Sequence, residues 1–243
     1  MRILTTLITF ILTSTISLKA DWKSDYDELL QKYVTKTGVK YHAWHQSKVD
    51  RRKMNAVLKG IGIEDVSKES RDGQLAYYLN AYNAWILHKI LENYPTNGPG
   101  GGGFIGRTRF FRSKSIQVAG QTTSFHLLEN NVIRPSFSEP RVHFALNCAS
   151  KSCPPLHNRT FTAENLDITL NQLSKNFINK NPLGINRKNS KEISISKIFD
   201  WYEADFEKNG PVLSYINRFR ERPFAQGTKI RYQAYQWTLN EAK

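Results

Sequence analysis

Two cysteines and the polar residues around them offer the clearest chemistry in this sequence. Cys148 and Cys153 are the only cysteines, and a short segment that leads into Pro154 separates them. In an oxidising compartment two lone cysteines this close form a disulfide if their Cβ atoms come within about 4 Å of each other. The ring is small, so it would brace the segment rather than greatly stabilise the fold. The spacing therefore predicts a Cys148–Cys153 disulfide.

A second interpretation makes Cys148 a thiol nucleophile. His143 lies five residues upstream, and Glu129 or Asn83 would orient its imidazole. A thiolate needs a pKa lowered by a nearby histidine, cation or helix N-terminus. The apolar run 142–146 predicts a short strand, however, and on a strand His143 and Cys148 would point to opposite sides. That geometry weighs against the nucleophile.

A zinc site is a third interpretation of the same segment. His143, Cys148, Cys153 and His157 are side chains that tetrahedral zinc accepts, but the closely spaced cysteine pairs of structural zinc sites are missing. We therefore expect no metal ion and no cofactor.

Asparagine, glutamate and arginine residues elsewhere indicate a polar cluster. Asn80 and Asn83 lie on one predicted helix, with Asn83 beside its apolar stripe, and a buried amide must find hydrogen-bond partners. Glu129, Arg134 and Arg141 are charged candidates for the same cluster. The cluster either clasps the loop near Asn147 as scaffold or lines a binding pocket.

The segment 97–115 is rich in glycine, phenylalanine and cations and has no helical or strand period, which predicts a loop. Its glycines imitate a phosphate-binding loop, but they follow a helix rather than a strand. Arg107, Arg109 and Arg112 alternate with phenylalanines and are candidates for binding an anionic or aromatic ligand. In the alternative interpretation the phenylalanines are core anchors and the arginines a solvated rim.

Periodicity predicts more helix than strand. Helical spacing covers 47–59, 71–93, 124–134, 162–178, 201–206 and 212–219, with another short helix near Tyr26, whereas 115–118, 142–146 and 192–196 are strand candidates. The strands are short and unevenly spaced. This pattern favours an α+β fold, a predominantly helical single domain over 21–243 with a small, short-stranded sheet.

Composition and the first residues indicate an exported basic protein. Residues 1–20 combine an early arginine, a short apolar run and a small residue at Ala20, as a secretory signal peptide does. We expect this peptide to be removed, no transmembrane segment to remain, and the rest to reach the periplasm or the medium. Lysine and arginine outnumber aspartate and glutamate by 35 to 21, giving a net charge of +14. Anionic envelope polymers and lipid head groups are the expected partners, and the diffuse charge carries no specific nucleic-acid motif.

Residues in five segments, 75–84, 128–135, 140–156, 170–177 and 196–206, resemble the family catalogued as domain of unknown function 547, and no activity defines that family. In that pattern a histidine usually follows Glu129, where this chain has Asn130, and an aspartate usually stands at Gln236. His126 lies one helical turn before Asn130 and would reach the same space. The resemblance runs in order from about Asp25 to Asn240.

Two functions remain open. One is an envelope hydrolase or acyl transferase built on Asn83, Glu129, His143 and Cys148. The other is a non-catalytic binding or structural module of the cell envelope, in which the disulfide and polar cluster support a basic, aromatic surface. Asn130 in place of the expected histidine and an export signal that favours oxidation tilt the balance toward the second.

Overall fold

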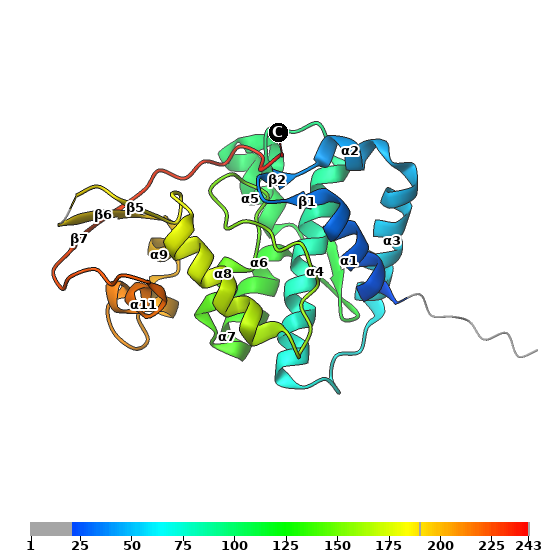
Figure 1. Ribbon diagram of the computed structural model, residues 1–243. Coiled ribbons are helices and arrows are strands. Elements are labelled where there is room, and N and C mark those ends of the chain that lie inside the picture. The colour runs from blue at the N-terminus through cyan, green and yellow to red at the C-terminus, as the bar shows by residue number, and fades with distance from the viewer. Residues whose placement is uncertain (1–20, 190, 243) are drawn as a thin grey trace, which may run out of the picture.

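Helices dominate the fold, and the strands are short. The computed structural model describes residues 21–189 and 191–242, so the predicted signal peptide lies outside the described residues. In the described ranges the strands form three separate small sheets (Figure 1). This confirms the predicted α+β class with helices in the majority.

The N-terminal part is a helical layer that packs on one long central helix. The layer consists of α1 (Trp22–Tyr33), the hairpin of β1 (Val34–Thr35) and β2 (Gly38–Val39), α2 (Tyr41–Gln46) and α3 (Lys48–Ile63), and the central helix is α4 (Arg71–Glu92). Serine side chains begin α3 and α4, since Ser47 accepts a hydrogen bond from the Asp50 amide and Ser70 from the Gly73 amide.

Helix α4 is the centre of the larger hydrophobic core. Its predicted stripe, which runs from Leu75 through Tyr82 to Ile90, is buried along its whole length. Full burial of one large apolar side chain contributes about 1.5–3 kcal/mol, so this stripe is a major source of folding free energy. The helix therefore provides a rigid support for whatever its polar residues hold.

The glycine-rich segment after α4 contains helices where the sequence predicts a loop. A short 3-10 turn, η1 (Pro99–Gly102), precedes α5 (Phe104–Arg112). Gly100 has φ +61°, and a Cβ on Gly106 would lie 1.9 Å from the Gly100 carbonyl oxygen, so both positions require glycine. Only Phe110 and Phe111 of α5 pack against the core. A helix held by so few side chains has no apolar period to detect, which is why the prediction failed.

A hairpin and a run of irregular helix follow. They comprise β3 (Ile116–Val118), β4 (Gln121–Thr123), α6 (Phe125–Leu127), the π-helical turn η2 (Leu128–Ile133) and α7 (Arg134–Phe137). The predicted turn at Ala119 and Gly120 joins β3 to β4, where both residues have positive φ. Pro135 does not end the helix as predicted, since the chain continues from η2 directly into α7, with Pro135 in the first turn of α7.

The predicted strand at 142–146 is wrong. The chain there forms a 3-10 helix, η3 (Pro140–Phe144), whose first turn is capped by the Glu139 carboxylate. Val142 packs into the larger core and Phe144 into the smaller one. A short buried apolar run has the same sequence signature whether it is strand or helix, so the run alone could not distinguish them.

The C-terminal part has its own, smaller core. It contains α8 (Leu166–Lys180), β5 (Ile185–Arg187), β6 (Glu192–Ile195), α9 (Ile198–Trp201), α10 (Glu203–Phe206), α11 (Val212–Phe219) and β7 (Lys229–Tyr232). Strand β6 lies between β5 and β7, antiparallel to the first and parallel to the second. The predicted strand at 192–196 is thereby confirmed, while the helix predicted at 162–178 begins four residues late.

The last residues cross back from the small core to the large one. The chain after β7 runs over the molecule toward α5 and β2 (Figure 1), and the Leu239 amide donates to the Asn97 carbonyl at 3.0 Å. The Lys151 amide donates to the Thr238 carbonyl at 2.8 Å. These bonds hold Tyr235 and Trp237 over the middle of the protein, beside the residues described next.

Candidate functional site

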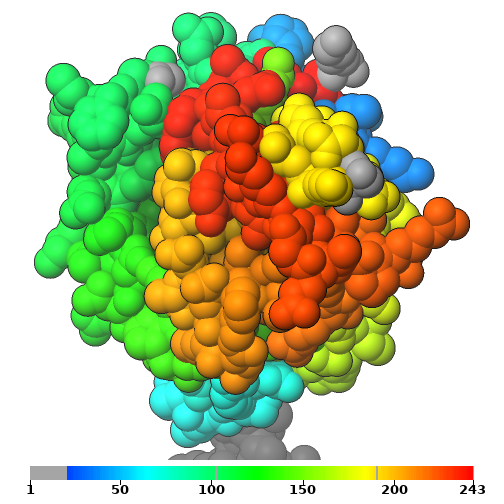
Figure 2. All heavy atoms as spheres, turned by 90° about the vertical axis from the view of Figure 1, so that its left-hand side faces the viewer, coloured from blue at the N-terminus to red at the C-terminus, as the bar shows by residue number. Residues whose placement is uncertain are grey.

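An aromatic pocket of about 190 Å³ lies where the two parts of the chain meet. On the face drawn in Figure 2, the green segments meet the orange and red segments along a furrow. One wall comes from α6 and η2, the other from α9, Tyr202 and the C-terminal segment. The pocket is lined by Tyr82, Phe111, His126, Glu129, Asn130, His143, Leu146, Cys148, Cys153, Pro154, Ile198, Trp201, Tyr202, Tyr235 and Trp237.

Glu129 places a carboxylate among phenols inside this pocket. Its exposed fraction is only 8%, and the Tyr82 hydroxyl donates to it across 3.5 Å. Burial raises the pKa of Tyr82 and Tyr202 well above the ordinary value, and the neighbouring Glu129 charge raises the pKa of both further. Both phenols therefore stay protonated and act as hydrogen-bond donors at neutral pH.

A π-helical turn aims Glu129 into the pocket. In η2 the wider turn inserts one extra residue into the helix, and such turns are frequent at functional sites. Glu129 thereby faces the pocket while Arg134, at the end of the turn, reaches α10. In a regular α-helix without the extra residue, either Glu129 would point away from the pocket or Arg134 would point away from α10.

A chain of hydrogen bonds runs along the pocket wall. Arg134 donates to Asn130 Oδ1 at 2.5 Å and to Asp205 Oδ2 at 2.6 Å. His143 Nε2 lies 2.8 Å from the same Asp205 oxygen. Partial burial alone would raise the pKa of Asp205, but the hydrogen bonds from His143 and Arg134 outweigh it and hold that pKa well below its usual range. Asp205 is therefore an ionised carboxylate that holds the Arg134 and His143 side chains in place.

His143 is packed rather than free to turn. It is 3% exposed, and its ring stacks on Tyr202 with the centroids 3.9 Å apart. Because η3 is a 3-10 helix and not a strand, His143 and Cys148 are not separated as predicted, and both residues line the pocket. The imidazole is nonetheless oriented by Asp205 and the Tyr202 ring.

The two cysteines are joined at the edge of the pocket. The sulfurs of Cys148 and Cys153 are 2.05 Å apart, as the predicted disulfide requires. The Tyr235 hydroxyl lies 3.2 Å from each sulfur. A disulfide sulfur is neither a thiolate nucleophile nor a zinc ligand. In the described ranges, histidine, cysteine, aspartate and glutamate form no group of three or more suited to a metal ion.

Comparison with known proteins shows a resemblance to one protein family. Residues 66–178 match the model of the family described as Protein of unknown function, DUF547. The chain resembles the DUF547 family. Searches of curated proteins and of solved structures found no match.

The DUF547 segment supplies only one side of the pocket. It contains Glu129, His143 and both cysteines, whereas Tyr202, Asp205 and the C-terminal aromatic residues follow it. The sequence predicts a resemblance that extends to Asn240, and the match covers its central part.

Asn130, which replaces the histidine expected from the DUF547 pattern, is engaged in the pocket wall. Its amide donates to the His126 carbonyl at 2.9 Å and lies 3.2 Å from His126 Nδ1. Both residues line the pocket, so His126 does reach the space that the sequence predicts for it. Asn130 also accepts the hydrogen bond from Arg134 and completes the wall.

Asn80 and Asn83 lie behind the pocket and clasp backbone. Asn83 donates to the Ala145 carbonyl and accepts from the Asn147 amide, each at 2.9 Å. Asn80 makes the same pair of bonds to Phe161, at 2.8 and 3.0 Å. Neither residue lines the pocket, so the orienting role considered for Asn83 gives way to the structural clasp.

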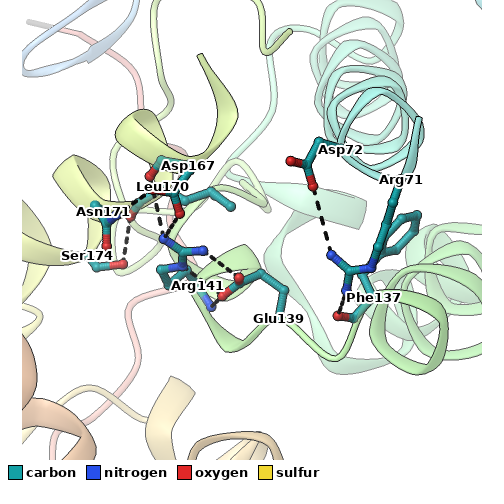
Figure 3. A network of polar contacts seen from close by, with 9 residues as sticks. All are labelled: Arg71, Asp72, Phe137, Glu139, Arg141, Asp167, Leu170, Asn171 and Ser174. Atoms are coloured by element: carbon teal, nitrogen blue, oxygen red, sulfur yellow. Dashed lines mark hydrogen bonds and ion pairs between the residues drawn. The ribbon is translucent and has the colours of Figure 1, made fainter. Parts of the chain in front are cut away.

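Arg141 does not join this cluster. Its guanidinium binds Glu139 and Asp167, with closest distances of 2.6 and 2.7 Å, as Figure 3 shows. Of the three charged candidates, Glu129 lines the pocket and Arg134 supports its wall through Asp205. Arg141 instead joins η3 to α8.

Helix α5 forms one rim of the pocket and then leaves the body of the protein. Phe111 lines the pocket, and the Arg107 guanidinium lies 4.6 Å from the centroid of the Trp237 ring. At the other end, Phe104 and Ile105 are 75% and 82% exposed. Arg109 and Arg112 are also exposed and do not line the pocket.

The residues that sequence reasoning missed come from the C-terminal half. Trp201, Tyr235 and Trp237 form an aromatic cluster at the pocket mouth, with centroids 4.7–5.7 Å apart. Tyr202 completes the interior, and Asp205 supports it from outside the lining through His143 and Arg134. The segment 196–206 carries part of the family resemblance, and its aromatic and acidic residues were the available signal.

Proposed function

We propose that this protein is a non-catalytic, exported binding module that docks on an anionic lipid surface of the cell envelope through α5. The aromatic pocket beside α5 takes a polar headgroup from that surface. One observation carries the proposal: Phe104 and Ile105 are almost fully exposed at the start of a helix that also bears three arginines.

The exposed apolar pair suits insertion into a lipid interface. Two large apolar side chains on a protruding helix are costly in water, and burying each fully contributes about 1.5–3 kcal/mol. Short helices with apolar and cationic residues bind at the boundary of headgroups and acyl chains. No helix in the described ranges is long and apolar enough to cross a membrane, so docking is peripheral in this proposal.

Charge around α5 favours an anionic lipid. The sequence between Glu92 and Glu129 contains no aspartate or glutamate, while it contains Arg107, Arg109, Arg112 and Lys114. A cation close to an anionic leaflet contributes about 1 kcal/mol. The local field therefore adds to the apolar term on the same helix.

The pocket chemistry supports binding rather than catalysis. The disulfide leaves no thiol, His143 is held by Asp205 and Tyr202, and Asn83 is committed to backbone. What remains available is Glu129 with its aromatic surroundings. A carboxylate accepts hydrogen bonds, so the pocket suits a headgroup that carries hydroxyl groups.

Vesicle sedimentation tests the proposal. The protein should bind phosphatidylglycerol vesicles and not phosphatidylcholine vesicles, and the binding should weaken as salt rises above about 0.1 M. The variant Phe104→Ser with Ile105→Ser should lose at least about tenfold in partitioning. The matched control is Ile168→Ser on α8, because Ile168 is also 75% exposed.

Equal binding to both vesicle types would contradict the anionic preference, and an equal loss in the Ile168→Ser variant would contradict docking by α5. The Glu129→Gln variant tests headgroup binding in the aromatic pocket separately from docking through α5. It should weaken binding to phosphatidylglycerol and leave binding to equally charged phosphatidylserine unchanged.

A further inference from the structure

A second, larger cavity lies on another part of the molecule. It has a volume of about 670 Å³ and lies between the end of α7, helix α8 and helix α11. Helices α8 and α11 lie side by side in Figure 1. Neither docking through α5 nor the aromatic pocket involves this cavity.

Four cations line this cavity, which we call the basic pocket. Arg141 is already paired with Glu139 and Asp167, and the other three come from three different elements. Lys175 comes from α8, Lys208 from the turn after α10 and Arg218 from α11. In the described part of the chain no carboxylate lies within ion-pair distance of any of them. Arg218 contacts the Tyr215 and Phe219 rings instead.

The carboxylates of the same lining are already neutralised. Glu139 accepts two hydrogen bonds from the Arg141 side chain, as Figure 3 shows, and Asp205 accepts from Arg134 and His143. The charge that the basic pocket leaves unbalanced is therefore positive.

Tyr215 provides an independent sign of a missing partner. It lines the basic pocket and is 6% exposed, yet its buried hydroxyl has no hydrogen-bond partner among the described residues. Burial first, and then the nearby Glu139 charge, raise the pKa of Tyr215, so the phenol is a neutral donor at physiological pH. An unsatisfied buried donor is rare in folded proteins, because it costs folding free energy without return. A ligand oxygen would satisfy it.

We propose that the basic pocket binds a compact phosphorylated small molecule, whose phosphate oxygens contact Lys175, Lys208 and Arg218 and accept a hydrogen bond from Tyr215. Two linked phosphate groups offer enough oxygens to reach three cations on separate elements, and the cavity is large enough for a diphosphate joined to a sugar or nucleoside. Asn171 and Ser214 are polar groups of the lining that suit the organic part.

Calorimetric titration with pyrophosphate tests the proposal on the full exported protein. Saturable binding in about 0.1 M salt is expected, with inorganic phosphate weaker than pyrophosphate. Citrate serves as a carboxylate probe of similar charge. Equal affinity for citrate would replace the phosphate assignment by a general polyanion site, and absence of saturable pyrophosphate binding would overturn the proposal.

Lysine variants separate a built site from general attraction. Lys175→Gln, Lys208→Gln and Arg218→Gln should each weaken pyrophosphate binding about 5–10-fold. Lys180→Gln removes the same charge from an exposed lysine of α8 outside the lining and should change affinity less than about twofold. If Lys180→Gln has the same effect as Lys175→Gln, the binding is diffuse electrostatics and the assigned site is wrong.

The Tyr215→Phe variant should lose affinity for pyrophosphate without losing stability in the absence of ligand. Without ligand, removal of an unsatisfied buried hydroxyl should leave the thermal midpoint unchanged or raise it. With pyrophosphate, the same variant should bind about fivefold more weakly, because the donor is gone. A lower midpoint without ligand, or unchanged affinity, would contradict the role given to this hydroxyl.

Discussion

The Asp205 carboxylate lies 2.8 Å from His143 Nε2, and the two residues line different pockets. His143 belongs to the aromatic pocket, and Asp205 belongs to the basic pocket on the other side of α10. The same oxygen also accepts from Arg134. One buried contact thus joins the walls of both cavities and the two halves of the chain.

Asp205→Asn should destabilise the fold by about 2–4 kcal/mol at pH 7, because Arg134 and His143 lose a charged partner in a mostly buried place. Urea unfolding measures this. Asp200→Asn is the control, since its pair with Lys197 is a surface pair worth at most about 1 kcal/mol. Equal losses in both variants would contradict a special role for Asp205.

The same pair predicts a pH dependence. The pKa of Asp205 is lowered in the folded state. Its contribution to the free energy of unfolding is therefore complete above the unfolded pKa of about 3.9 and is lost as the pH falls through the folded pKa. The stability difference between wild type and Asp205→Asn should therefore shrink below about pH 4. A difference that grows on acidification would show that the sign is wrong.

The helical framework was largely predictable from sequence, and Asp205 shows where prediction stopped. The stripe on α4 and the hairpin turn at Gly120 have local signatures, because burial and backbone conformation there depend on neighbours in sequence. The contact between His143 and Asp205 joins residues 62 positions apart, and no local pattern encodes it. Helix α5 was missed because few of its side chains face a core, and η3 was mistaken for a strand because a short buried apolar run has the same signature in both structures.

Asn83→Ala should cost about 2–4 kcal/mol, because the Ala145 carbonyl and the Asn147 amide would both lose buried partners. Asn176→Ala, on α8, removes only a hydrogen bond from Gln172 that is exposed to solvent, and should stay within about 0.5 kcal/mol of wild type. Chemical denaturation of the two variants checks the prediction. A loss for Asn83→Ala no larger than for Asn176→Ala would mean that the clasp is not formed.

Protein from an export-competent host should contain no thiol that reacts with iodoacetamide before reduction, because Cys148 and Cys153 are linked. The closed ring is short, so the Cys148→Ser, Cys153→Ser variant should lose roughly 2 kcal/mol at most. Two alkylated thiols in unreduced protein would reopen the nucleophile interpretation, and activity screens with Cys148→Ala as the control would follow.

Gly106→Ala should destabilise α5, although the same change inside most helices stabilises by about 1 kcal/mol. The added Cβ would lie 1.9 Å from the Gly100 carbonyl oxygen, so η1 and α5 would have to separate. Amide hydrogen exchange should speed up in 99–112 and stay unchanged in α4. Slower exchange in 99–112 would contradict this close contact.

Fluorescence from a probe on α5 tests membrane docking most directly. Phe104→Cys and Ile168→Cys, each labelled with an environment-sensitive fluorophore, place the probe at two sites that are both highly exposed in the native protein. With phosphatidylglycerol vesicles, the probe at position 104 should shift its emission to the blue and be quenched by brominated acyl chains, while the probe at position 168 should not respond. Equal responses at both positions, or none at position 104, would contradict docking through α5.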